Sequence, residues 1–475
     1  MPCDGASADE NAVATLRLIG PTPPNWVPDR EGVDHNVAII GGGQSGSALG
    51  FALRRAGIGK VSIIEAAEEE DQAGIWLTAA RMNLLRTPKS LVGPEIGLPA
   101  LGFQAWYEAR HGREAYAAID RIRRTDWAAY LIWYRAFLDI PARYGTKLLH
   151  VEPRDGCFAL QLDVGGVRRV ETARKIILAT GFHGSGGNYI PSFLTANVPA
   201  RLYAHTEQVI DFASLRGKMV GVIGAAASAF DAAGVALENG AAEVHLFARR
   251  AAIASLPVAR ARMYQGAYDN YYELPDLLRW RLAVRFRAAG SSPTVDAIER
   301  AVKFPNFHLH LAAPWTDARP EDGRVVGWVD AKEFRCDFVI AATGYFADPN
   351  ARPELAGIAP KIMLWRDRLT EAASDAYLGA HPYLGAGHEY LPRDPGGDPA
   401  VAGYLRDIHV QNPSGFVSFG LPIGDVPSMR RDIPAIVARI SRDLFQTDAA
   451  AHEQRMFGDV APDFPPELYA SALRR

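Results

Sequence analysis

The sequence predicts an α/β protein made of two Rossmann-like dinucleotide-binding domains, with the second domain inserted into a discontinuous first one. Two observations support this prediction. A strand, a glycine-containing turn, a helix and another strand follow one another twice, starting near Val37 and again near Lys218. Each unit is followed later in the chain by a strand-like run that ends in Ala-Thr-Gly. This spacing indicates two related domains rather than a short-period repeat.

Composition and charge exclude several classes of protein. The 475 residues are 48% hydrophobic and 22% charged, which is enough for two or three domains with buried cores. The net charge of −3 gives no general basic field that would attract nucleic acid. No apolar run approaches the ~20 residues of a membrane span, and the N-terminus lacks the pattern of a secretion signal. We expect a cytoplasmic protein with a small-molecule substrate and no nucleic-acid partner or membrane span, and we leave a homo-oligomer open.

The cysteines and histidines predict neither a dithiol centre nor a metal centre. Cys3, Cys157 and Cys336 are far apart and form no C-x-x-C pair, which is typical of a protein from a reducing cytosol. His308 and His310 would share one face of a strand, but two ligands do not make a metal site. We therefore expect an ordinary strand at these histidines.

The segments of the chain can be assigned from composition and periodicity. Residues 76–145 are rich in tryptophan and tyrosine, have a helical period and predict a helical insertion near the first domain, with the clearest helix over 126–138. A further helix is predicted over 433–444. The predicted order is an N-terminal arm (1–34), the first part of the first domain (35–205), the second domain (206–335), the returning part of the first domain (336–445) and a tail (446–475).

The first glycine motif lies between a buried strand and an apolar helix. Gly41 allows the tight turn, Gly43 lets the backbone approach a pyrophosphate, and Gly46 allows the helix to pack closely on the strand. Glu65 ends the next strand at about the expected ~20-residue interval and can accept hydrogen bonds from ribose hydroxyls. A carboxylate there would repel a 2′-phosphate, so the site suits FAD or NAD. The aromatic insertion favours FAD, because a bulky isoalloxazine ring needs such cover. The alternative for Glu65 is a solvated acid in an acidic run.

The second motif has lost two glycines. Gly224 keeps the first position, whereas Ala226 and Ala229 each add a methyl group. Alanine is an accepted variant at the third position, and at the second it displaces the pyrophosphate without forbidding it. The next strand ends in Arg249 and Arg250, where the first domain has its glutamate, and arginine can pair with a 2′-phosphate. The motif therefore predicts NADPH; the alternative is a helix N-terminus with two surface arginines and no ligand.

These features together resemble the class B flavin-dependent monooxygenases, which include flavin-containing monooxygenases, N-hydroxylases and Baeyer–Villiger enzymes. The resemblance covers roughly residues 35–445 and extends to four more segments: AGIW (73–76), NLLRTPKSLVG (83–93), DFVIAATGYFADP (337–349) and PIGDVP (422–427). Two departures matter. The asparagine that follows the threonine in flavin-containing monooxygenases is missing after Thr87, and only His205 matches the Baeyer–Villiger linker motif, which would fall at 199–205.

The resemblance implies an enzyme in which NADPH reduces FAD, and the reduced flavin traps O₂ as a C4a-(hydro)peroxide that oxygenates a small molecule. N-hydroxylation or N-oxidation of an amine is the expected reaction. A Baeyer–Villiger enzyme acting on a ketone is one alternative, and a redox sensor or scaffold that binds both nucleotides without turnover is another.

The site residues follow from the motifs and the resemblance. The candidates for catalysis near the flavin are Asn83, Arg86 and Thr87, and no metal ligand is predicted. The residues expected to contact the two nucleotides are Gly41, Gly43, Gln44, Ser45, Gly46, Glu65, Trp76, Thr180, Gly181, Gly224, Ala226, Ser228, Arg249, Arg250, Thr343, Gly344, Gly424 and Asp425.

Overall fold

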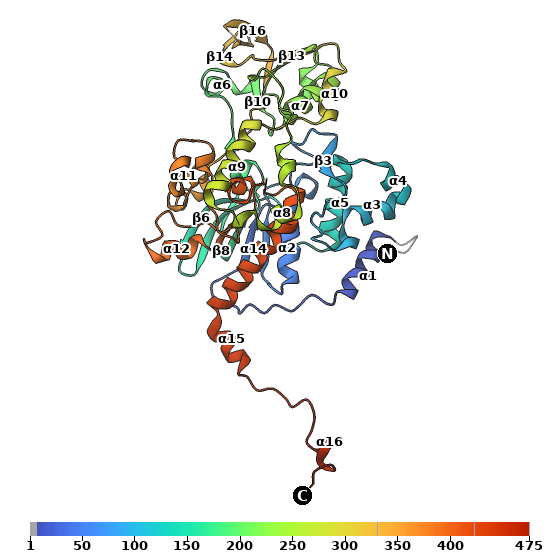
Figure 1. Ribbon diagram of the computed structural model, residues 1–475, viewed down its shortest axis with the longest axis vertical. Helices are drawn as coiled ribbons and strands as arrows, with labels where there is room; N and C mark the ends of the chain where they lie inside the picture. Colours follow the sequence, from blue (N-terminus) through green and yellow to red (C-terminus); the bar gives the residue numbers. More distant parts are fainter. Residues whose placement is uncertain (1–6, 330, 422, 475) are drawn as a thin grey trace.

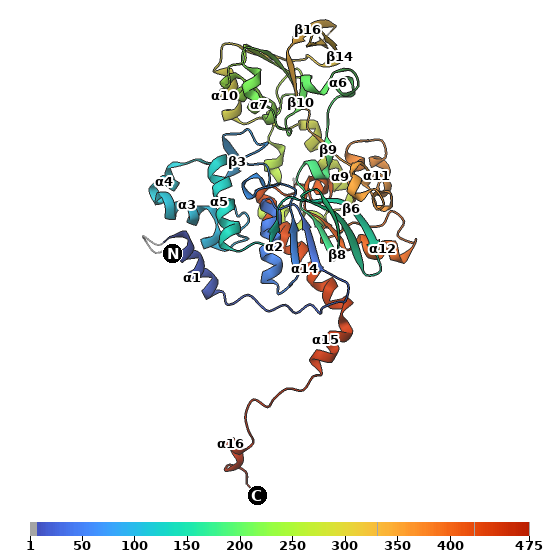
Figure 2. The same cartoon turned by 180° about the vertical axis from the view of Figure 1, so that it is seen from behind.

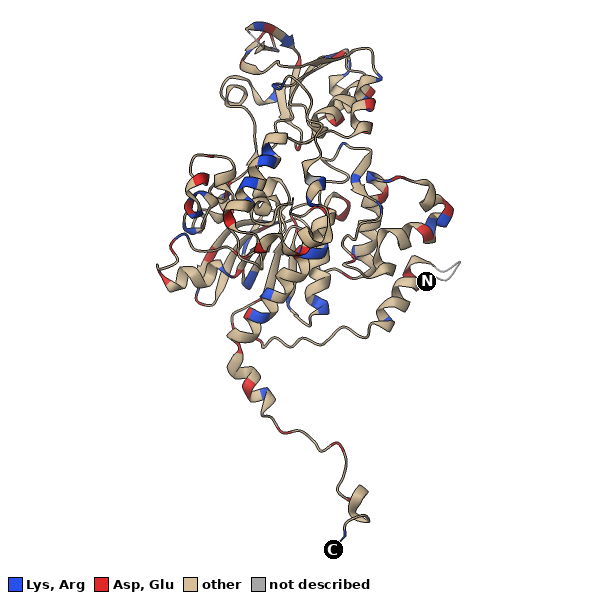
Figure 3. Cartoon of the chain, viewed as in Figure 1, with Lys and Arg blue, Asp and Glu red and all other residues tan. Residues whose placement is uncertain are grey.

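The structure is a computed structural model that describes residues 7–329, 331–421 and 423–474. Figures 1 and 2 show two lobes, each built around its own sheet, with a C-terminal tail that leaves the larger lobe and extends away from it. Lys and Arg are mixed with Asp and Glu over both lobes (Figure 3). No helix within the described residues is both long enough and apolar enough to cross a membrane.

The larger lobe contains a seven-stranded sheet in the order β5-β2-β1-β8-β7-β6, with β19 added to the end of β8. Strand β1 lies between β2 and β8 and runs parallel to both, whereas β6, β7 and β8 form an antiparallel meander. The strands are β1 (His35–Ile40), β2 (Val61–Ile64), β5 (Ala142–Arg143), β6 (Thr146–Arg154), β7 (Cys157–Val164), β8 (Val167–Leu178) and β19 (Ile408–Val410).

Both faces of β1 are buried, which explains its continuous apolar sequence. Side chains alternate between the two faces of a strand, so Val37 and Ile39 join one core and Ala38 and Ile40 join another. The first core lies under α2 (Gln44–Arg55), α5 (Arg124–Phe137) and α14 (Val426–Thr447).

The smaller lobe contains an all-parallel sheet in the order β10-β17-β11-β12-β13. Helices α7 and α10 cover one face, and the three-stranded antiparallel sheet β14-β15-β16 covers the other. The elements are β10 (Tyr203–His205), β11 (Met219–Ile223), α7 (Ala227–Glu238), β12 (Glu243–Phe247), α10 (Val295–Val302), β13 (Phe307–His310), β14 (Trp315–Glu321), β15 (Arg324–Val329), β16 (Lys332–Cys336) and β17 (Phe338–Ala341).

The pairing of β10 and β17 corrects the boundaries drawn from the sequence. Both strands were predicted within the first domain, in segments 35–205 and 336–445, but both pair in the second sheet. The reason is that each Ala-Thr-Gly strand lies beside the strand that leads into its own turn, β8 beside β1 and β17 beside β11. The chain passes between the lobes through the antiparallel pair β9 (Gly186–Asn188) and β18 (Tyr345–Ala347).

The predicted insertion at 76–145 contains the helices α3 (Phe103–His111), α4 (Arg113–Ala118) and α5 joined by irregular segments, and its main helix, predicted over 126–138, is α5 at 124–137. The sequence analysis missed a short antiparallel pair within it, because β3 pairs with β4 only across a long break in sequence and with an irregular register. The two strands of this pair are β3 (Leu84–Pro88) and β4 (Arg121–Arg123).

The two ends of the chain behave differently. In the predicted arm, α1 (Ala8–Leu18) begins with a capping box between Ser7 and Glu10 and contacts α3. At the other end, α14 is longer than the helix predicted over 433–444 and is followed by α15 (Ala449–Met456) and α16 (Glu467–Ala470). The remaining helices are α9 (Asp276–Ala289) and the shorter α6 (Ser192–Asn197), α8 (Gln265–Asn270), α11 (Trp365–Arg368), α12 (Pro399–Leu405) and α13 (Phe416–Phe419).

Candidate cofactor and substrate site

The first glycine turn is closed by two glycines that tolerate no side chain. Gly41 has a φ of +107°, and a Cβ there would overlap the carbonyl oxygen of Ala179. A Cβ at Gly46 would overlap the carbonyl oxygen of Gly41 itself. These two positions therefore build the turn between β1 and α2, as the fingerprint predicts.

Gly43 has a different role, because it leaves open space. It is the N-cap of α2 with a φ of −64°, a conformation that other residues also adopt. A Cβ at Gly43 would meet nothing closer than the Cα of Gly74, 3.6 Å away. The turn thus leaves a free cradle at a helix N-terminus, where N–H groups and the helix dipole favour a phosphate. The residues present fit the pyrophosphate of a dinucleotide.

Glu65 lies against this cradle. Its Oε2 accepts a hydrogen bond of 2.6 Å from the backbone N–H of Gly42, and its Oε1 accepts one of 2.8 Å from that of Ala67. These bonds hold the carboxylate at the end of β2, beside the turn. This position is consistent with the predicted contact to ribose hydroxyls, which stays a prediction.

One wall of the same site is formed by residues of α5 and by the residues that lead into α14. Gln44, the first residue of α2, donates through Nε2 to the carbonyl oxygen of Gly424 (2.8 Å), and its Oε1 accepts from Nε1 of Trp127 (3.1 Å). The Trp76 ring packs edge-on against Trp127 with centroids 6.3 Å apart. Ser45 Oγ lies 3.5 Å from the same carbonyl of Gly424. Residues from four distant parts of the chain therefore meet at the N-terminus of α2.

Asp425 belongs to this wall as the N-cap of α14. Its carboxylate accepts from the backbone N–H of Ser428 at 3.1 Å. Burial raises the pKa of Asp425 to about 7. Pro422, at the start of the PIGDVP segment, lies outside the described residues.

The second turn repeats the first with one substitution that the backbone explains. A Cβ at Gly224, which has a φ of +122°, would overlap the carbonyl oxygen of Ala342, just as one at Gly41 would overlap that of Ala179. Ala226 is the N-cap of α7 with φ −87° and ψ −178°, close to the φ −64° and ψ −168° of Gly43. Because this conformation needs no glycine, the substitution adds only a methyl group to the cradle.

The second turn has positively charged side chains near it, whereas the first turn has a carboxylate. Ser228 is exposed in the first turn of α7, and Arg249 and Arg250 are exposed after β12. Arg250 donates to the carbonyl oxygen of Ala289 at 3.0 Å. The end of β12 is therefore cationic, where the equivalent end of β2 carries Glu65.

The two Ala-Thr-Gly segments meet between the lobes. The Thr180 hydroxyl accepts from Nδ2 of Asn412 (3.1 Å), and the Thr343 hydroxyl donates to the carbonyl oxygen of Tyr189. Gly181 and Gly344 both have positive φ, at +61° and +84°. The rings of the residues that follow them, Phe182 and Tyr345, lie 4.9 Å apart.

His205 stabilises this junction. Its Nε2 lies 2.9 Å from the carbonyl oxygen of Gly344, and burial lowers its pKa to about 4. The imidazole is neutral at neutral pH and donates this hydrogen bond. The residue that matched the Baeyer–Villiger linker thus holds the second Ala-Thr-Gly segment in this structure.

The three candidates for catalysis do not form one cluster. Asn83 is exposed just before β3, and its carbonyl oxygen accepts from the N–H of Arg124 at 3.0 Å. Arg86 and Thr87 are neighbours on β3, so their side chains leave opposite faces of the strand. Thr87 lines a cavity, whereas Arg86 interacts electrostatically with Asp231 of α7 in the other lobe. Sequence proximity alone could not show this separation.

The cavity has a volume of about 540 Å³ and lies between α1, the segment 85–92, α3 and α5. Phe103 and Trp127 contribute aromatic faces, and Thr87, Lys89 and Glu95 contribute polar groups. Lys89 donates to the carbonyl oxygens of Tyr116 (2.7 Å) and Ile119 (2.6 Å), and burial raises the pKa of Glu95. Because Trp127 also binds Gln44, the cavity adjoins the first nucleotide turn.

A charged group that the sequence analysis missed connects the lobes. Arg300 of α10 binds both carboxylate oxygens of Glu238, through Nε (2.9 Å) and Nη2 (2.6 Å), and its Nη1 donates to the carbonyl oxygen of Arg81 (2.6 Å). Asp231 is 3% exposed, and burial raises its pKa to about 6 although Arg86 and Arg300 act in the opposite direction. No local sequence pattern signals this group, because its members come from three separate segments.

Replacing Arg300 with methionine should destabilise the protein. The substitution removes charge-assisted hydrogen bonds from a side chain that is only 10% exposed, so we expect the free energy of unfolding to fall by about 1.5–3 kcal/mol. Lys303→Met is the matched control, since Lys303 is 58% exposed and 3.8 Å from the same Glu238, and it should cost less than ~1 kcal/mol. Denaturant titration measures both values, and equal losses in the two variants would contradict the role given to Arg300.

Comparison with known proteins relates most of the chain to an FAD-dependent enzyme. A family model described as pyridine nucleotide-disulphide oxidoreductase matches residues 38–261. The chain is 39% identical over 446 residues to an FAD-dependent urate hydroxylase from Xanthomonas campestris, which covers 92% of this chain and 93% of that protein.

Solved structures show a similar fold. The ornithine N-hydroxylase of Kutzneria sp. 744 aligns with a TM-score of 0.66 and 16% identity, covering 86% of this chain and 99% of that one. L-lysine 6-monooxygenase from Pseudomonas syringae aligns with a TM-score of 0.64 and 18% identity, covering 87% and 99%. At these identities the similarity concerns the fold, and it confirms the predicted α/β class with two Rossmann-type units.

Proposed function

The chain belongs to the flavin-dependent monooxygenase family that includes the FAD-dependent urate hydroxylase of Xanthomonas campestris, and from this premise we propose that it hydroxylates urate or a closely related purine. The predicted class is therefore confirmed. The reaction consumes one O₂ and one NADPH with a proton for each substrate, and it yields the hydroxylated product, NADP⁺ and water. The choice of substrate rests on the 39% identity to that urate hydroxylase, which extends over 92% of the chain.

The geometry supports a small planar substrate beside the first turn. A cavity of about 540 Å³ lies within the usual range for small-molecule sites. Its two aromatic side chains, Phe103 and Trp127, can contact the flat faces of a bicyclic ring, and Thr87 offers a hydroxyl to its polar edge. Trp127 lines this cavity and also donates a hydrogen bond to Gln44 at the first turn, so a substrate here would lie close to the cofactor.

The two glycine turns would bind the two nucleotide cofactors of this reaction. Bound FAD would supply the activation of O₂, which no side chain can perform. The cradle at Gly43 and the N-terminus of α2 would bind its pyrophosphate, and Glu65 its ribose. Gly224, Ala226 and Arg249 would bind NADPH in the smaller lobe. The aromatic wall of α3 and α5 would exclude water from the reacting centre, which prevents loss of the oxidising equivalents.

Substrate-dependent oxidation of NADPH tests this proposal. We expect urate to raise the rate of NADPH oxidation by the FAD-loaded enzyme well above the rate without substrate, with urate lost in parallel. Ornithine, lysine and a simple ketone belong in the same panel. Stimulation by an amine alone would favour the N-hydroxylation predicted from the sequence, and stimulation by the ketone alone would favour Baeyer–Villiger chemistry. An FAD that NADPH does not bleach would favour the non-turnover sensor.

A further inference from the structure

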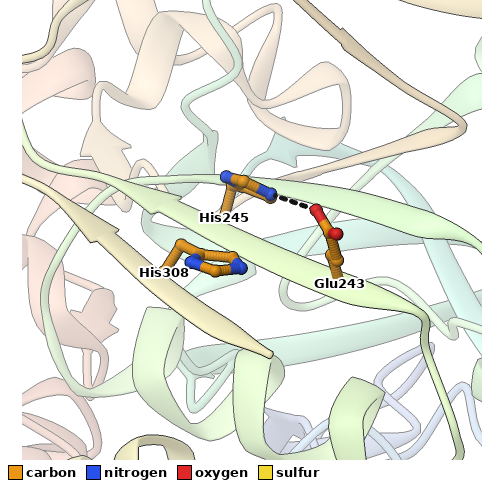
Figure 4. A group of neighbouring side chains, drawn as sticks. All are labelled: Glu243, His245 and His308. Atoms are coloured by element: carbon orange, nitrogen blue, oxygen red, sulfur yellow. Dashed lines mark hydrogen bonds and ion pairs between the residues drawn. The ribbon is translucent and has the colours of Figure 1, made fainter. Parts of the chain in front are cut away.

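Three side chains with metal-binding atoms gather at the edge of the second sheet, on β12 and β13 (Figure 4). Glu243 and His245 are two residues apart on β12, so they share one face of the sheet. His308 on β13 pairs directly with His245 in the parallel register. One potential ligand atom from each side chain lies within 4.8 Å of the others.

We propose that Glu243, His245 and His308 bind a divalent transition-metal ion of the zinc type. Two imidazoles and one carboxylate are a ligand set that Zn²⁺ prefers, and water completes the four-coordinate shell. Ligand atoms around a tetrahedral zinc are ~3.3 Å apart, since each lies about 2.0–2.1 Å from the metal. His245 Nε2 and Glu243 Oε2 are already 2.9 Å apart, so the approach of His308 by side-chain rotation completes the set.

A fourth histidine can orient the central ligand. His245 Nδ1 lies 3.0 Å from Nε2 of His310. When His245 Nε2 binds the metal, its Nδ1–H donates a hydrogen bond to Nε2 of His310, which takes the place that a carboxylate, a backbone carbonyl or a water usually has beside a metal-bound imidazole. The His310 ring is held in place by stacking on Phe247, with centroids 4.6 Å apart and planes at 10°. Rotation of His245 is further limited by Phe334, whose centroid is 4.8 Å away.

The cluster is open to solvent and separate from the nucleotide turns. His308 is partly exposed, the Glu243 side chain is 44% exposed, and the His245 side chain is 13% exposed. Glu243 begins β12, whereas Arg249 and Gly224 lie at the carboxyl ends of the parallel strands. A metal here would join β12 to the outermost strand β13 and stabilise the sheet edge; it would not take part in the reaction.

The sequence pattern FHLHL predicted only an ordinary strand, because His308 and His310 alone offer two ligands. The missing ligands lie on β12, far away in sequence, and only the parallel register between β12 and β13 brings them together. His310 is in turn the supporting residue and not the second ligand.

Titration of the FAD-loaded, tag-free protein with Zn²⁺ after chelator treatment tests the proposal. We expect saturable binding of one ion, a Zn²⁺-dependent rise in the thermal unfolding midpoint, and a tetrahedral-type visible spectrum when Co²⁺ replaces Zn²⁺. His308→Gln and Glu243→Gln should each weaken binding at least tenfold, and both variants should fold because both side chains are at least partly exposed. His111→Gln, an exposed histidine of α3, is the matched control and should bind like the parent.

Two results would overturn the proposal. One is the absence of saturable binding to the folded parent protein. The other is equal affinity for Zn²⁺ in the parent, His308→Gln and Glu243→Gln, which would show that the ion binds elsewhere on the surface. Because the assay measures metal binding and unfolding, neither result depends on urate turnover.

Discussion

Gly43→Val should give a folded protein that no longer retains FAD. A Cβ at Gly43 meets no protein atom closer than 3.6 Å, so the protein itself has room for a side chain. A branched side chain would instead fill the space that the pyrophosphate needs at the N-terminus of α2. We expect FAD affinity to fall by at least about 100-fold, equivalent to ~2.7 kcal/mol. Flavin absorbance of the purified protein and reconstitution with added FAD measure this loss.

Two controls separate loss of the cofactor from loss of the fold. Gly43→Ala reproduces the residue at Ala226 in the second turn and should bind FAD with an intermediate affinity. Gly46→Ala should fail to fold properly, because its Cβ would overlap the carbonyl oxygen of Gly41. Normal FAD content in folded Gly43→Val would contradict the assignment of the first turn.

Arg249→Ala should raise the NADPH KM by roughly tenfold or more and leave the NADH KM nearly unchanged. Arg249 follows β12 much as Glu65 follows β2, and a charge-assisted pair with a 2′-phosphate is worth about 1.5–3 kcal/mol. Arg250 is already engaged with the carbonyl oxygen of Ala289, so the double variant should lose more than Arg249→Ala, but not twice as much. Steady-state kinetics with both nucleotides measures these effects.

The control for Arg249 is another exposed arginine of the same lobe. Arg335 lies on β16 and pairs with Glu321 and Glu333, so Arg335→Ala should change neither KM. An equal rise of the NADPH KM and the NADH KM in Arg249→Ala, or a parent enzyme that prefers NADH, would show that Arg249 does not bind a 2′-phosphate.

Local patterns predicted the two turns well, because the turns are local structures. The glycines of each motif, the helix that follows and the strand beyond it lie within one continuous segment, and their spacing is set by backbone geometry alone. The structure adds that a Cβ at Gly41 or at Gly224 would overlap an equivalent carbonyl oxygen, that of Ala179 or that of Ala342, at the start of each Ala-Thr-Gly segment.

Features that depend on distant pairing could not be predicted in the same way. Strand β17 leads into the second Ala-Thr-Gly and joins the second sheet, and nothing in its sequence distinguishes that sheet from the first. The cavity exists because α1, from the predicted arm, contacts α3. The link from Arg300 to Arg81 likewise depends on how the two lobes meet.

The predicted trio for catalysis illustrates a further limit of sequence analysis. Arg86 and Thr87 are adjacent in sequence, but a strand sends neighbouring side chains to opposite faces. Of the three, only Thr87 therefore lines the proposed substrate cavity, whereas Arg86 interacts electrostatically with Asp231 in the other lobe. The sequence analysis expected a helical segment here and did not recognise the short strand β3, so it did not separate the Arg86 and Thr87 side chains.

Isotope labelling tests directly whether the enzyme transfers one oxygen atom from O₂ to urate. The FAD-loaded enzyme is supplied with NADPH, urate and ¹⁸O₂, and the product, the remaining NADPH and any H₂O₂ are measured together. We expect one ¹⁸O atom in the product and one NADPH oxidised for each urate consumed, with the second oxygen atom released as water. Recovery of all NADPH electrons as H₂O₂, with no ¹⁸O in any product of urate, would contradict it.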